Sequence, residues 1–413
     1  MAHPKVLYIS YDGMTDPLGQ SQVIPYLIGL TKEGYEFTIL SFEKSERFKK
    51  YKSAIEAVCI ANGIKWVPLM YTKKPPILST LWDIWKMYRA SSKMYKQEKF
   101  SIIHCRSYIS ALAGLYLKRK YGARMIFDMR GFWADERIDG GIWPRDKEPY
   151  KTIYHFFKRK EKEFLENADY VITLTYAAEK EIHSWKNIDN NPIPITVIPC
   201  CADMNTFSPV RVDHTLKAQI RKDTGLKESD YIFLYLGSLG TWYMLEEMLA
   251  FFKVLQSKRN NAKLLFLTND TREVLIHKIE NAGIDKNSVV ILNAPFNEVP
   301  TYISLSDSSI FFIKPAYSKK GSSPIKQGEL MSMGIPVVCN AHVGDTDLIV
   351  RKYHSGVVVA NLDTPGYEKA LEELFTDKFD REMIIKGAGE YFSTEEGVKK
   401  YLDVYKKVLG QHS

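Results

Sequence analysis

The sequence predicts an α/β protein built from two Rossmann-like domains, each a parallel sheet covered by helices. Short apolar runs alternate with amphipathic segments in the first half of the chain, which is the pattern of such a sheet. A turn-rich stretch at residues 187–209 carries four prolines and breaks this pattern. A second series of apolar runs and amphipathic segments then begins, so we place a domain boundary in this stretch.

The expected elements follow this alternation in chain order. In the first domain we expect strands at residues 5–10, 36–41, 64–69, 101–105, 124–128 and 170–175, and helices at 21–33, 48–62 and 107–121. In the second we expect strands at 231–236, 263–267, 289–292, 309–313, 336–338 and 356–359, and helices at 245–258, 271–281, 299–305 and 325–333. The expected domains are residues 1–205 and 206–390, and a C-terminal segment, 391–413, contains a helix that packs back on the first domain. Ligands of such folds bind at the carboxyl ends of the strands, here in a cleft where the two domains face each other.

Composition places the chain among ordinary globular proteins. Of its 413 residues, 57 are Lys or Arg and 49 are Asp or Glu, and the net charge of +8 favours phosphates or anionic lipid without indicating nucleic acid. The five cysteines form no Cys-x-x-Cys pair, which argues against a zinc ribbon and for a reducing compartment. The start of the chain lacks the apolar core of a signal peptide, and no apolar run reaches the roughly 18 residues that span a membrane. We therefore expect a cytoplasmic protein.

The segment after the expected strand at 309–313 carries the most informative chemistry. A loop of one glycine and two serines leads into Pro324 and a helix, and we expect the proline as first helical residue with a serine cap. The free amides and the dipole of such a helix start attract anions, so a diphosphate fits there. Lys326 would face a phosphate, and Glu329 would accept the hydroxyls of a ribose. Spacing alone leaves open that the two are solvated neighbours on a helix.

Several segments spread over the chain add to this pattern. They are Asp12-Gly13 with Leu18 to Gln22, Ile103 to Arg106, Ala168 to Thr173, Ile198-Pro199 with Asp203 and Phe207, Tyr235 to Ser238, and Glu329 to Val338. In their order and spacing they resemble the family 4 glycosyltransferases of the GT-B fold, a group of retaining enzymes that use nucleotide sugars. The resemblance implies a nucleotide-sugar donor linked to UDP or GDP. The donor-binding candidates are Gly19, Ser238, Asn293, Ser322, Ser323, Lys326 and Glu329.

The chain also departs from that family's pattern. Many members have two glutamates, of which Glu329 matches the second, whereas Gly321 stands where the first would be. Ser238 replaces the family's arginine. The lysine that the family has a few residues later is absent, because its place falls in residues 240–243, which are Gly-Thr-Trp-Tyr. The chain instead resembles a branch with a Ser-Pro-x-Lys-x-x-Glu motif, in which Lys326 supplies the cation.

Polar residues also follow the expected strands of the first domain, where loops often carry function. Gly19 would let backbone approach a phosphate closely, and the alternative is an ordinary turn glycine. The loop at 129–137 would orient the acceptor, and the alternative is that its charged residues form salt bridges that hold the loop. For His104 the alternative to a functional role is a hydrogen-bonded residue near the core. The catalytic candidates are Lys326, Asp128, Arg130 and His104. The acceptor-binding candidates are Asp12, Arg106, Trp133, Asp135, Glu136 and Arg137.

No covalent nucleophile stands out, and the resemblance implies front-face attack assisted by a donor phosphate oxygen. Electrostatic stabilisation by Lys326 and the helix amides is the expected catalytic device. Residues 345–347 look like an Asp-x-Asp metal motif but follow Gly344, where the family has a sugar-contacting loop, so we expect no metal and no other cofactor.

Two segments, 72–100 and 150–162, mix aromatic residues with bases, as helices on anionic bilayers do. The alternative for each is a core-packing face beside a solvated face. Together they favour a peripheral enzyme on the inner face of the cytoplasmic membrane, with a glycan or lipid-linked saccharide as acceptor in the synthesis of surface polysaccharide, lipopolysaccharide or glycolipid. No nucleic-acid module is present. A nucleotide-sugar epimerase and a catalytically silent nucleotide-sugar-binding scaffold stay open as alternatives.

Overall fold

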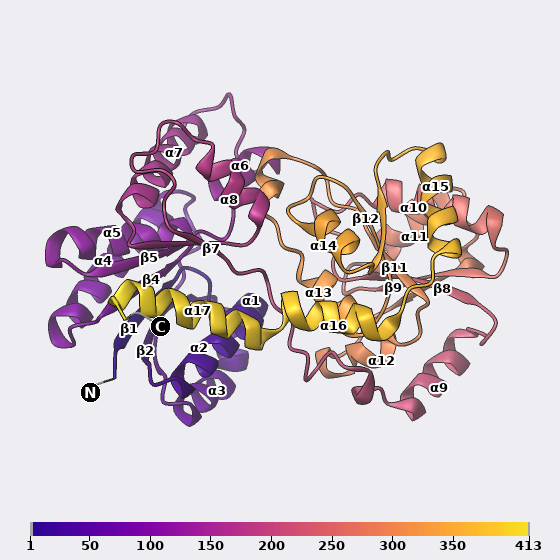
Figure 1. Ribbon diagram of the computed structural model, residues 1–413, viewed down its shortest axis with the longest axis horizontal. Helices are drawn as coiled ribbons and strands as arrows, with labels where there is room; N and C mark the ends of the chain where they lie inside the picture. Colours follow the sequence, from indigo (N-terminus) through magenta and orange to yellow (C-terminus); the bar gives the residue numbers. More distant parts are fainter. Residues whose placement is uncertain (1–2, 412–413) are drawn as a thin grey trace. The chain divides into compact units, whose positions relative to one another are not determined.

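The computed structural model describes residues 3–411, which form two compact units (Figure 1). Unit 1 comprises the chain up to Pro199, the short segment Lys320–Ser322 and the chain from Thr394 onward. Unit 2 comprises Cys200–Lys319 and Ser323–Ser393. Each unit contains a parallel sheet covered by helices, which confirms the predicted α/β class with two Rossmann-like domains.

Unit 1, as far as the structure describes it, is built on a seven-stranded parallel sheet in the order β3-β2-β1-β4-β5-β6-β7. Strands β4 and β6 are buried along their whole length, as expected where helices cover both faces of a sheet. The strand order reverses between β1 and β4, and ligands of open α/β sheets bind outside the carboxyl ends of the strands at such a point. The strands are β1 (Lys5–Ser10), β2 (Glu36–Glu43), β3 (Lys65–Met70), β4 (Ile102–Arg106), β5 (Arg124–Asp128), β6 (Tyr170–Thr173) and β7 (Ile195–Val197).

The helices of unit 1 lie between these strands, except for the last, which comes from the end of the chain. They are α1 (Pro17–Gln22), α2 (Ile24–Lys32), α3 (Ser45–Ala61), α4 (Leu78–Gln97), α5 (Ser107–Tyr121), α6 (Trp133–Asp139), α7 (Tyr150–Asn167), α8 (Tyr176–His183) and α17 (Thr394–Leu409).

Unit 2 contains a six-stranded parallel sheet, in its described residues, with the order β10-β9-β8-β11-β12-β13, so the reversal lies between β8 and β11. Its strands are β8 (Tyr231–Leu236), β9 (Ala262–Leu267), β10 (Val289–Leu292), β11 (Ser308–Phe311), β12 (Val337–Asn340) and β13 (Gly356–Val359). Its helices are α9 (His214–Thr224), α10 (Leu245–Lys258), α11 (Arg272–Asn281), α12 (Val299–Ile303), α13 (Ile325–Ser332), α14 (Thr346–Lys352), α15 (Thr364–Thr376) and α16 (Arg381–Phe392).

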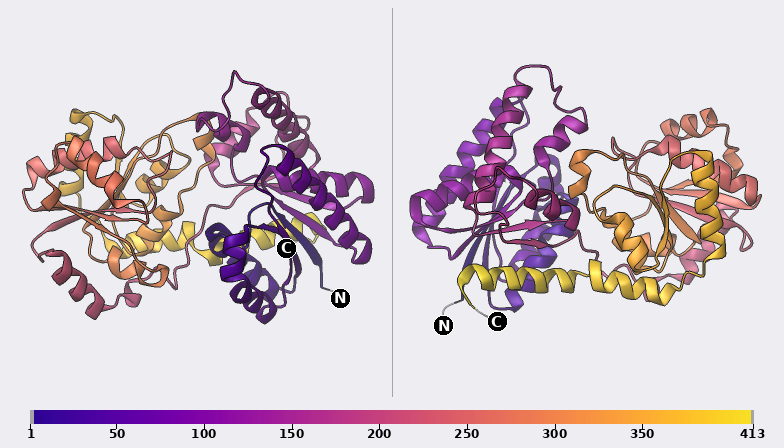
Figure 2. Two further views of the ribbon diagram at one scale, coloured as in Figure 1. Left: turned by 180° about the vertical axis from the view of Figure 1, so that it is seen from behind. Right: turned by 45° about the horizontal axis from the view of Figure 1, so that its top comes forward.

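Helix α17 belongs to unit 1 and packs against α2 (Figure 2). Gly29 permits their close approach, because a Cβ at that position would lie 2.4 Å from Cγ2 of Val398. Tyr401 and Tyr405 are buried at helical spacing on the inner face of α17. The C-terminal helix thereby brings two phenol groups into unit 1.

The structure corrects two local predictions. The helix expected at 21–33 is two helices, α1 and α2, separated at Val23, because Pro25 lacks an N–H and its ring clashes with the carbonyl of residue 21 in a continuous helix. The turn-rich stretch contains β7, which was not predicted because three residues are too few to show an alternating pattern. Within residues 3–411, no helix combines the length and apolar composition needed to cross a bilayer.

Candidate functional site

The start of α13 in unit 2 differs from the predicted proline-and-serine arrangement. Pro324 is the N-cap residue, one position before the helix, and no side chain caps the first turn. The Ser323 hydroxyl instead accepts a 3.1 Å hydrogen bond from the backbone N–H of Cys200. The prediction of Pro324 as first helical residue with a serine cap is therefore wrong, because the serine is used to fix the chain at Cys200. In the described residues, no side-chain oxygen caps the first turn of this helix by a hydrogen bond.

Lys326, in the first turn of α13, is buried between two aromatic rings. Its Nζ lies 4.4 Å from the ring centroid of Tyr235 and 3.8 Å from that of Tyr243, and the residue is 6% exposed. It donates a 3.3 Å hydrogen bond to the Tyr235 hydroxyl, and no carboxylate of residues 3–411 lies within ion-pair distance of it. Burial lowers the pKa of Lys326 to about 7, because the enclosed ammonium is poorly solvated. A phosphate at Nζ would supply the missing counter-charge.

Glu329 lies one turn further along α13 and is partly buried. Burial raises the pKa of its carboxyl to about 7, and the nearby Lys326 opposes this rise. The carboxylate makes no hydrogen bond or ion pair with another described residue. Its oxygens are therefore available to accept hydrogen bonds from two neighbouring hydroxyls of a sugar ring. Paired shifts of this kind are typical of functional sites.

The loop after β8 shapes the space around Lys326. Gly237 has a φ of 101°, which favours glycine, and a Cβ there would lie 3.3 Å from Nζ of Lys326. The carbonyl of the exposed Ser238 accepts a 2.7 Å hydrogen bond from the Tyr235 hydroxyl, which in turn accepts from Lys326. This chain of hydrogen bonds orients the ammonium. Asn293, the remaining donor candidate in this unit, is exposed directly after β10.

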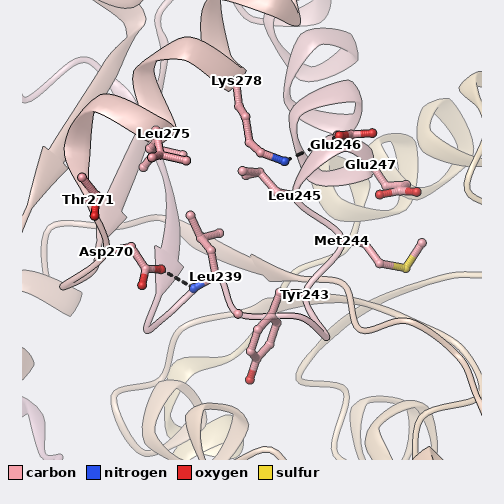
Figure 3. A pocket seen from close by; sticks show the side chains of 12 residues that line it. Leu239, Tyr243, Met244, Leu245, Glu246, Glu247, Asp270, Thr271, Leu275 and Lys278 are labelled. Atoms are coloured by element: carbon pink, nitrogen blue, oxygen red, sulfur yellow. Dashed lines mark hydrogen bonds and ion pairs between the residues drawn. The ribbon is translucent and has the colours of Figure 1, made fainter. Parts of the chain in front are cut away.

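A groove of about 480 Å³ opens beside this loop in unit 2 (Figure 3). Tyr243 contributes to its wall and also contacts Lys326 with its ring. The Asp270 carboxylate, in the loop after β9, lines the groove and accepts a hydrogen bond from the backbone N–H of Leu239 (Figure 3). The volume of this groove lies in the range of small-molecule sites.

The loop between β1 and α1 in unit 1 is organised by a buried glutamate that was not predicted from the sequence. Glu43 ends β2 and accepts hydrogen bonds from the backbone N–H groups of Met14 at 2.7 Å and Thr15 at 3.0 Å. The position of Glu43 at the end of an apolar strand is the sequence feature that could have indicated its role. A Cβ at Gly19 would lie 2.3 Å from the carbonyl oxygen of Gly13. Packing therefore requires glycine at 19, and its approach to a phosphate stays a prediction.

His104 and Asp128 lie in a buried hydrogen-bonded network at the carboxyl end of the unit 1 sheet. Nδ1 of His104 is 2.7 Å from the Tyr405 hydroxyl, and its Nε2 is 3.4 Å from Oδ2 of Asp128. Tyr401 donates a 3.1 Å hydrogen bond to the same carboxylate oxygen. Burial lowers the pKa of His104, whereas the pKa of Asp128 is lowered despite burial by Arg130 and the histidine. This placement matches the hydrogen-bonded alternative to a catalytic histidine, and the catalytic role stays a prediction.

Two arginines flank this network. Arg106 ends β4, is 4% exposed, and its Nε lies 3.6 Å from Oδ2 of the half-exposed Asp12. Its Nε and Nη1 make no hydrogen bond to any residue that the structure describes. Arg130 has a φ of 58°, which is uncommon for an arginine, and its Nη1 lies 3.7 Å from Oδ1 of Asp128. Asp12 and Arg106 thus lie together where the strand order of unit 1 reverses.

The other acceptor candidates are engaged in packing on and around α6. Trp133 lies in an aromatic cluster, and the guanidinium carbon of Arg137 lies 5.1 Å from the centroid of its ring. The Asp135 carboxylate forms a 2.8 Å ion pair with Lys158. Glu136, in the first turn of α6, is partly exposed. For Trp133 and Asp135 these contacts agree with the structural alternative to acceptor binding.

Gly321, which stands where the resembling family has a glutamate, belongs to the short segment Lys320–Ser322 of unit 1. A Cβ at residue 321 would lie 2.8 Å from Cα of Gly131, closer than real Cβ atoms approach backbone. The Lys320 carbonyl accepts a 2.5 Å hydrogen bond from the Thr175 hydroxyl, which fixes the segment. A glutamate at 321 therefore does not fit unless the backbone moves. The donor candidate Ser322 ends this segment and is partly buried.

The aspartates at 345 and 347 do not form a cluster with other potential metal ligands. Asp345 is the N-cap of α14 and accepts a 3.0 Å hydrogen bond from the Tyr391 hydroxyl. In the described part of the chain, no group of three or more His, Cys, Asp or Glu residues could hold a metal ion.

Two family profiles match the chain. The family described as "Glycosyl transferases group 1" matches residues 217–391, and "Glycosyltransferase Family 4" matches residues 23–206. The D-inositol 3-phosphate glycosyltransferase of Salinispora tropica is 21% identical over 336 residues, which cover 76% of this chain and 65% of that protein. The chain thus aligns with less than two thirds of that relative's length.

Solved structures share the fold at low sequence identity. The sucrose-phosphate synthase of Thermosynechococcus elongatus gives a TM-score of 0.72 at 15% identity, covering 99% of this chain and 100% of that one. Anabaena HepE in complex with UDP and glucose gives 0.66 at 13% identity, covering 98% and 100%. At such identities the likeness concerns the fold.

Proposed function

Because this chain belongs to glycosyltransferase family 4 and is a glycosyltransferase of the GT-B fold, we propose that it is a retaining enzyme that uses a UDP- or GDP-linked hexose or related sugar. The observation that carries the proposal is the buried Lys326 ammonium, which has aromatic neighbours and no carboxylate partner in the described residues. The UDP bound by HepE supports a nucleotide-sugar donor.

In this proposal the donor diphosphate binds at Lys326 and at the first-turn amides of α13. The free protein holds the pKa of Lys326 at about 7, and a bound diphosphate raises it, so the amine is protonated when the donor is in place. As the bond between sugar and phosphate breaks, negative charge grows on the diphosphate, and the ammonium and amides stabilise it. Glu329 accepts the ribose hydroxyls.

The transfer step that we propose keeps the configuration at the sugar carbon. The acceptor hydroxyl attacks from the face that the diphosphate leaves, so that a bond from the acceptor oxygen to the sugar carbon forms as the sugar–phosphate bond breaks. The hydroxyl proton passes to a phosphate oxygen of the departing diphosphate. Lys326 and the helix amides carry the charge in this scheme, which therefore includes no metal ion or other cofactor.

For the acceptor we propose a glycan or a lipid-linked saccharide used in the synthesis of surface polysaccharide, lipopolysaccharide or glycolipid. Asp12 is the unit 1 candidate best placed to meet its hydroxyls, because its carboxylate is half exposed whereas Arg106, Asp128 and His104 are enclosed. We further propose that the enzyme acts as a cytoplasmic protein in peripheral contact with the membrane.

Donor binding tests the proposal directly. A thermal-shift screen of UDP, GDP and other nucleoside diphosphates identifies the base, because a ligand of the folded state stabilises it by mass action. Lys326→Ala is then expected to weaken binding of the selected nucleotide by about tenfold to a hundredfold, since it removes a charge-assisted hydrogen bond. Glu329→Ala is expected to weaken it by about tenfold, measured by titration calorimetry.

Lys258→Ala is the matched control, since this exposed lysine ends α10 and is expected to leave nucleotide binding unchanged. If Lys326→Ala and Glu329→Ala both bind the nucleotide and release it from the sugar donor as the unchanged protein does, the proposed donor site is wrong.

A further inference from the structure

Helix α4 of unit 1 exposes large apolar side chains where a surface helix ordinarily exposes polar ones. In its first half Ser79 and Asp83 are buried, while the apolar residues around them face outward. Burial of apolar surface drives folding, so a helix that buries a carboxylate and exposes two tryptophans is unusual. An exposed apolar face of this kind is typical of a surface that binds a partner or a membrane. The exposed apolar residues are Leu78 (63%), Leu81 (56%), Trp82 (51%) and Trp85 (47%).

The second half of α4 continues the same exposed stripe with bases. Arg89, Lys93 and Lys96 follow Trp85 at intervals of three and four residues and are exposed. The Arg89 guanidinium carbon lies 5.4 Å from the ring centroid of Trp85, and the rings of Trp82 and Trp85 stack with centroids 4.6 Å apart. Apolar and cationic side chains therefore form one continuous surface, the α4 stripe, from Leu78 to Lys96.

No acid neutralises the α4 stripe. The only acid of the helix, Asp83, is buried, pairs with Lys86 and accepts a 3.0 Å hydrogen bond from the Tyr11 hydroxyl. Arg89, Lys93 and Lys96 have no carboxylate partner among the residues that the structure describes. A groove of about 440 Å³ beside the stripe is lined by these three bases and by aromatic residues and serine, without any acid.

Helix α7 lies in the other segment that mixes aromatic residues with bases, but several of these side chains make contacts within unit 1. Lys158 and Lys160 form ion pairs with glutamates of the same helix, and Phe157 is buried in the unit 1 core. Tyr154 donates a hydrogen bond to Asp135. Lys158, Lys160 and Lys162 of α7 are thus paired with acids, which is not found for Arg89, Lys93 or Lys96 of the α4 stripe in the described residues.

We propose that the α4 stripe binds the surface of an anionic phospholipid bilayer. The leucines and tryptophans would enter the headgroup boundary, where tryptophan is favoured, and the three bases would meet lipid phosphates. A second copy of the chain fits less well, because a second stripe offers no carboxylate to pair with Arg89, Lys93 and Lys96. The inference deepens the proposed function by naming the surface through which the enzyme reaches a lipid-linked acceptor.

Vesicle sedimentation of the full chain, without donor or acceptor, tests this surface. We expect binding to vesicles of phosphatidylcholine mixed with phosphatidylglycerol, weaker binding to phosphatidylcholine alone, and a loss of the difference at high salt. The triple variant Arg89→Gln/Lys93→Gln/Lys96→Gln is expected to bind the anionic vesicles about a hundredfold more weakly, and Trp82→Ser/Trp85→Ser at least about tenfold. Tryptophan fluorescence should shift to the blue on binding only when Trp82 and Trp85 are present.

Matched variants in unit 2 control for a general loss of charge or apolar surface. Lys222→Gln/Lys258→Gln/Lys286→Gln removes three exposed bases, and Val210→Ser/Met383→Ser removes two exposed apolar side chains. Both are expected to bind vesicles as the unchanged protein does. Nucleotide calorimetry on the same samples separates the two proposals, because donor binding does not require the stripe.

Three outcomes would overturn the inference. The first is failure to bind anionic vesicles at low salt while nucleotide binding is intact. The second is vesicle binding that the stripe variants leave unchanged. The third is a concentration-dependent dimer that Trp82→Ser/Trp85→Ser dissociates, without vesicle binding, which would assign the stripe to a second copy.

Discussion

Both units bury charge at the carboxyl end of a parallel sheet, but they surround it differently. In unit 2 the Lys326 ammonium is enclosed by tyrosine rings and has no carboxylate within ion-pair distance in the described residues. In unit 1 the Asp128 carboxylate has an arginine, a histidine and a tyrosine around it. A buried charge without a counter-charge costs stability, so it persists where a ligand supplies the partner. A charge that the chain itself satisfies needs no ligand, and this difference distinguishes the proposed donor site from the network around Asp128.

The largest expected effect comes from breaking the satisfied network. Asp128→Ala removes the buried carboxylate that accepts from Tyr401 and lies beside His104 and Arg130, and it is expected to destabilise unit 1 by about 3–5 kcal/mol. Hydrogen exchange at the amides of β4 and β5 measures this loss in unit 1 alone. The exposed Asp146, changed to alanine, serves as control and should cost less than about 1 kcal/mol. An Asp128→Ala protein as stable as the control would mean that the network is not structural.

A smaller effect is expected when one hydroxyl is removed from the same network. Tyr401→Phe deletes the donor to Asp128 and keeps the ring, so we expect a loss of about 1.5–3 kcal/mol, the range for hydrogen bonds to charged groups. Tyr51→Phe is the matched change, because the Tyr51 hydroxyl makes no hydrogen bond to a described residue. Equal exchange rates in the two variants would show that α17 contributes packing only.

The smallest effect is expected in unit 2. Lys326→Met removes a poorly solvated cation and should leave the unfolding free energy of unit 2 unchanged or raise it by roughly 1 kcal/mol, while nucleotide binding is weakened. Urea unfolding monitored at the amides of β8 and β11 provides the measurement. A large destabilisation would indicate that the ammonium has a structural partner, and the contrast with Asp128 would disappear.

The pKa shifts of Lys326 and Glu329 predict how the stability of unit 2 depends on pH. The pKa of Lys326 is lowered from 10.5 to about 7, so its contribution to stability is complete above pH 10.5 and is lost as the pH falls to 7. The pKa of Glu329 is raised from 4.5 to about 7, so its contribution is complete below pH 4.5 and is lost as the pH rises to 7. Stability measured against Lys326→Met/Glu329→Gln should therefore reach a minimum near pH 7, and a flat difference would contradict these shifts.

The sequence predicts the sheets and the presence of helix α13, though not its cap, because both depend on local patterns. Apolar runs of strand length and a proline before Lys326 and Glu329 are visible without any tertiary information. The tyrosines around Lys326 come from β8 and the loop after it, and those around Asp128 come from α17. Such partners are far apart in the chain, and no local pattern indicates them. The burial that shifts the pKa of Lys326 is likewise a property of the folded unit.

The contact between Gly131 and Gly321 has a consequence for how the two positions can change. A Cβ at Gly131 would lie 3.2 Å from the carbonyl oxygen of Gly321, and one at Gly321 would lie 2.8 Å from Cα of Gly131. A side chain at residue 131 would separate the backbones and so relieve the contact that requires glycine at 321, whereas Gly131 also has a φ of 108°, which favours glycine whatever lies opposite. The two sites should therefore be epistatic, and a glutamate introduced at residue 321 alone would displace the segment Lys320–Ser322.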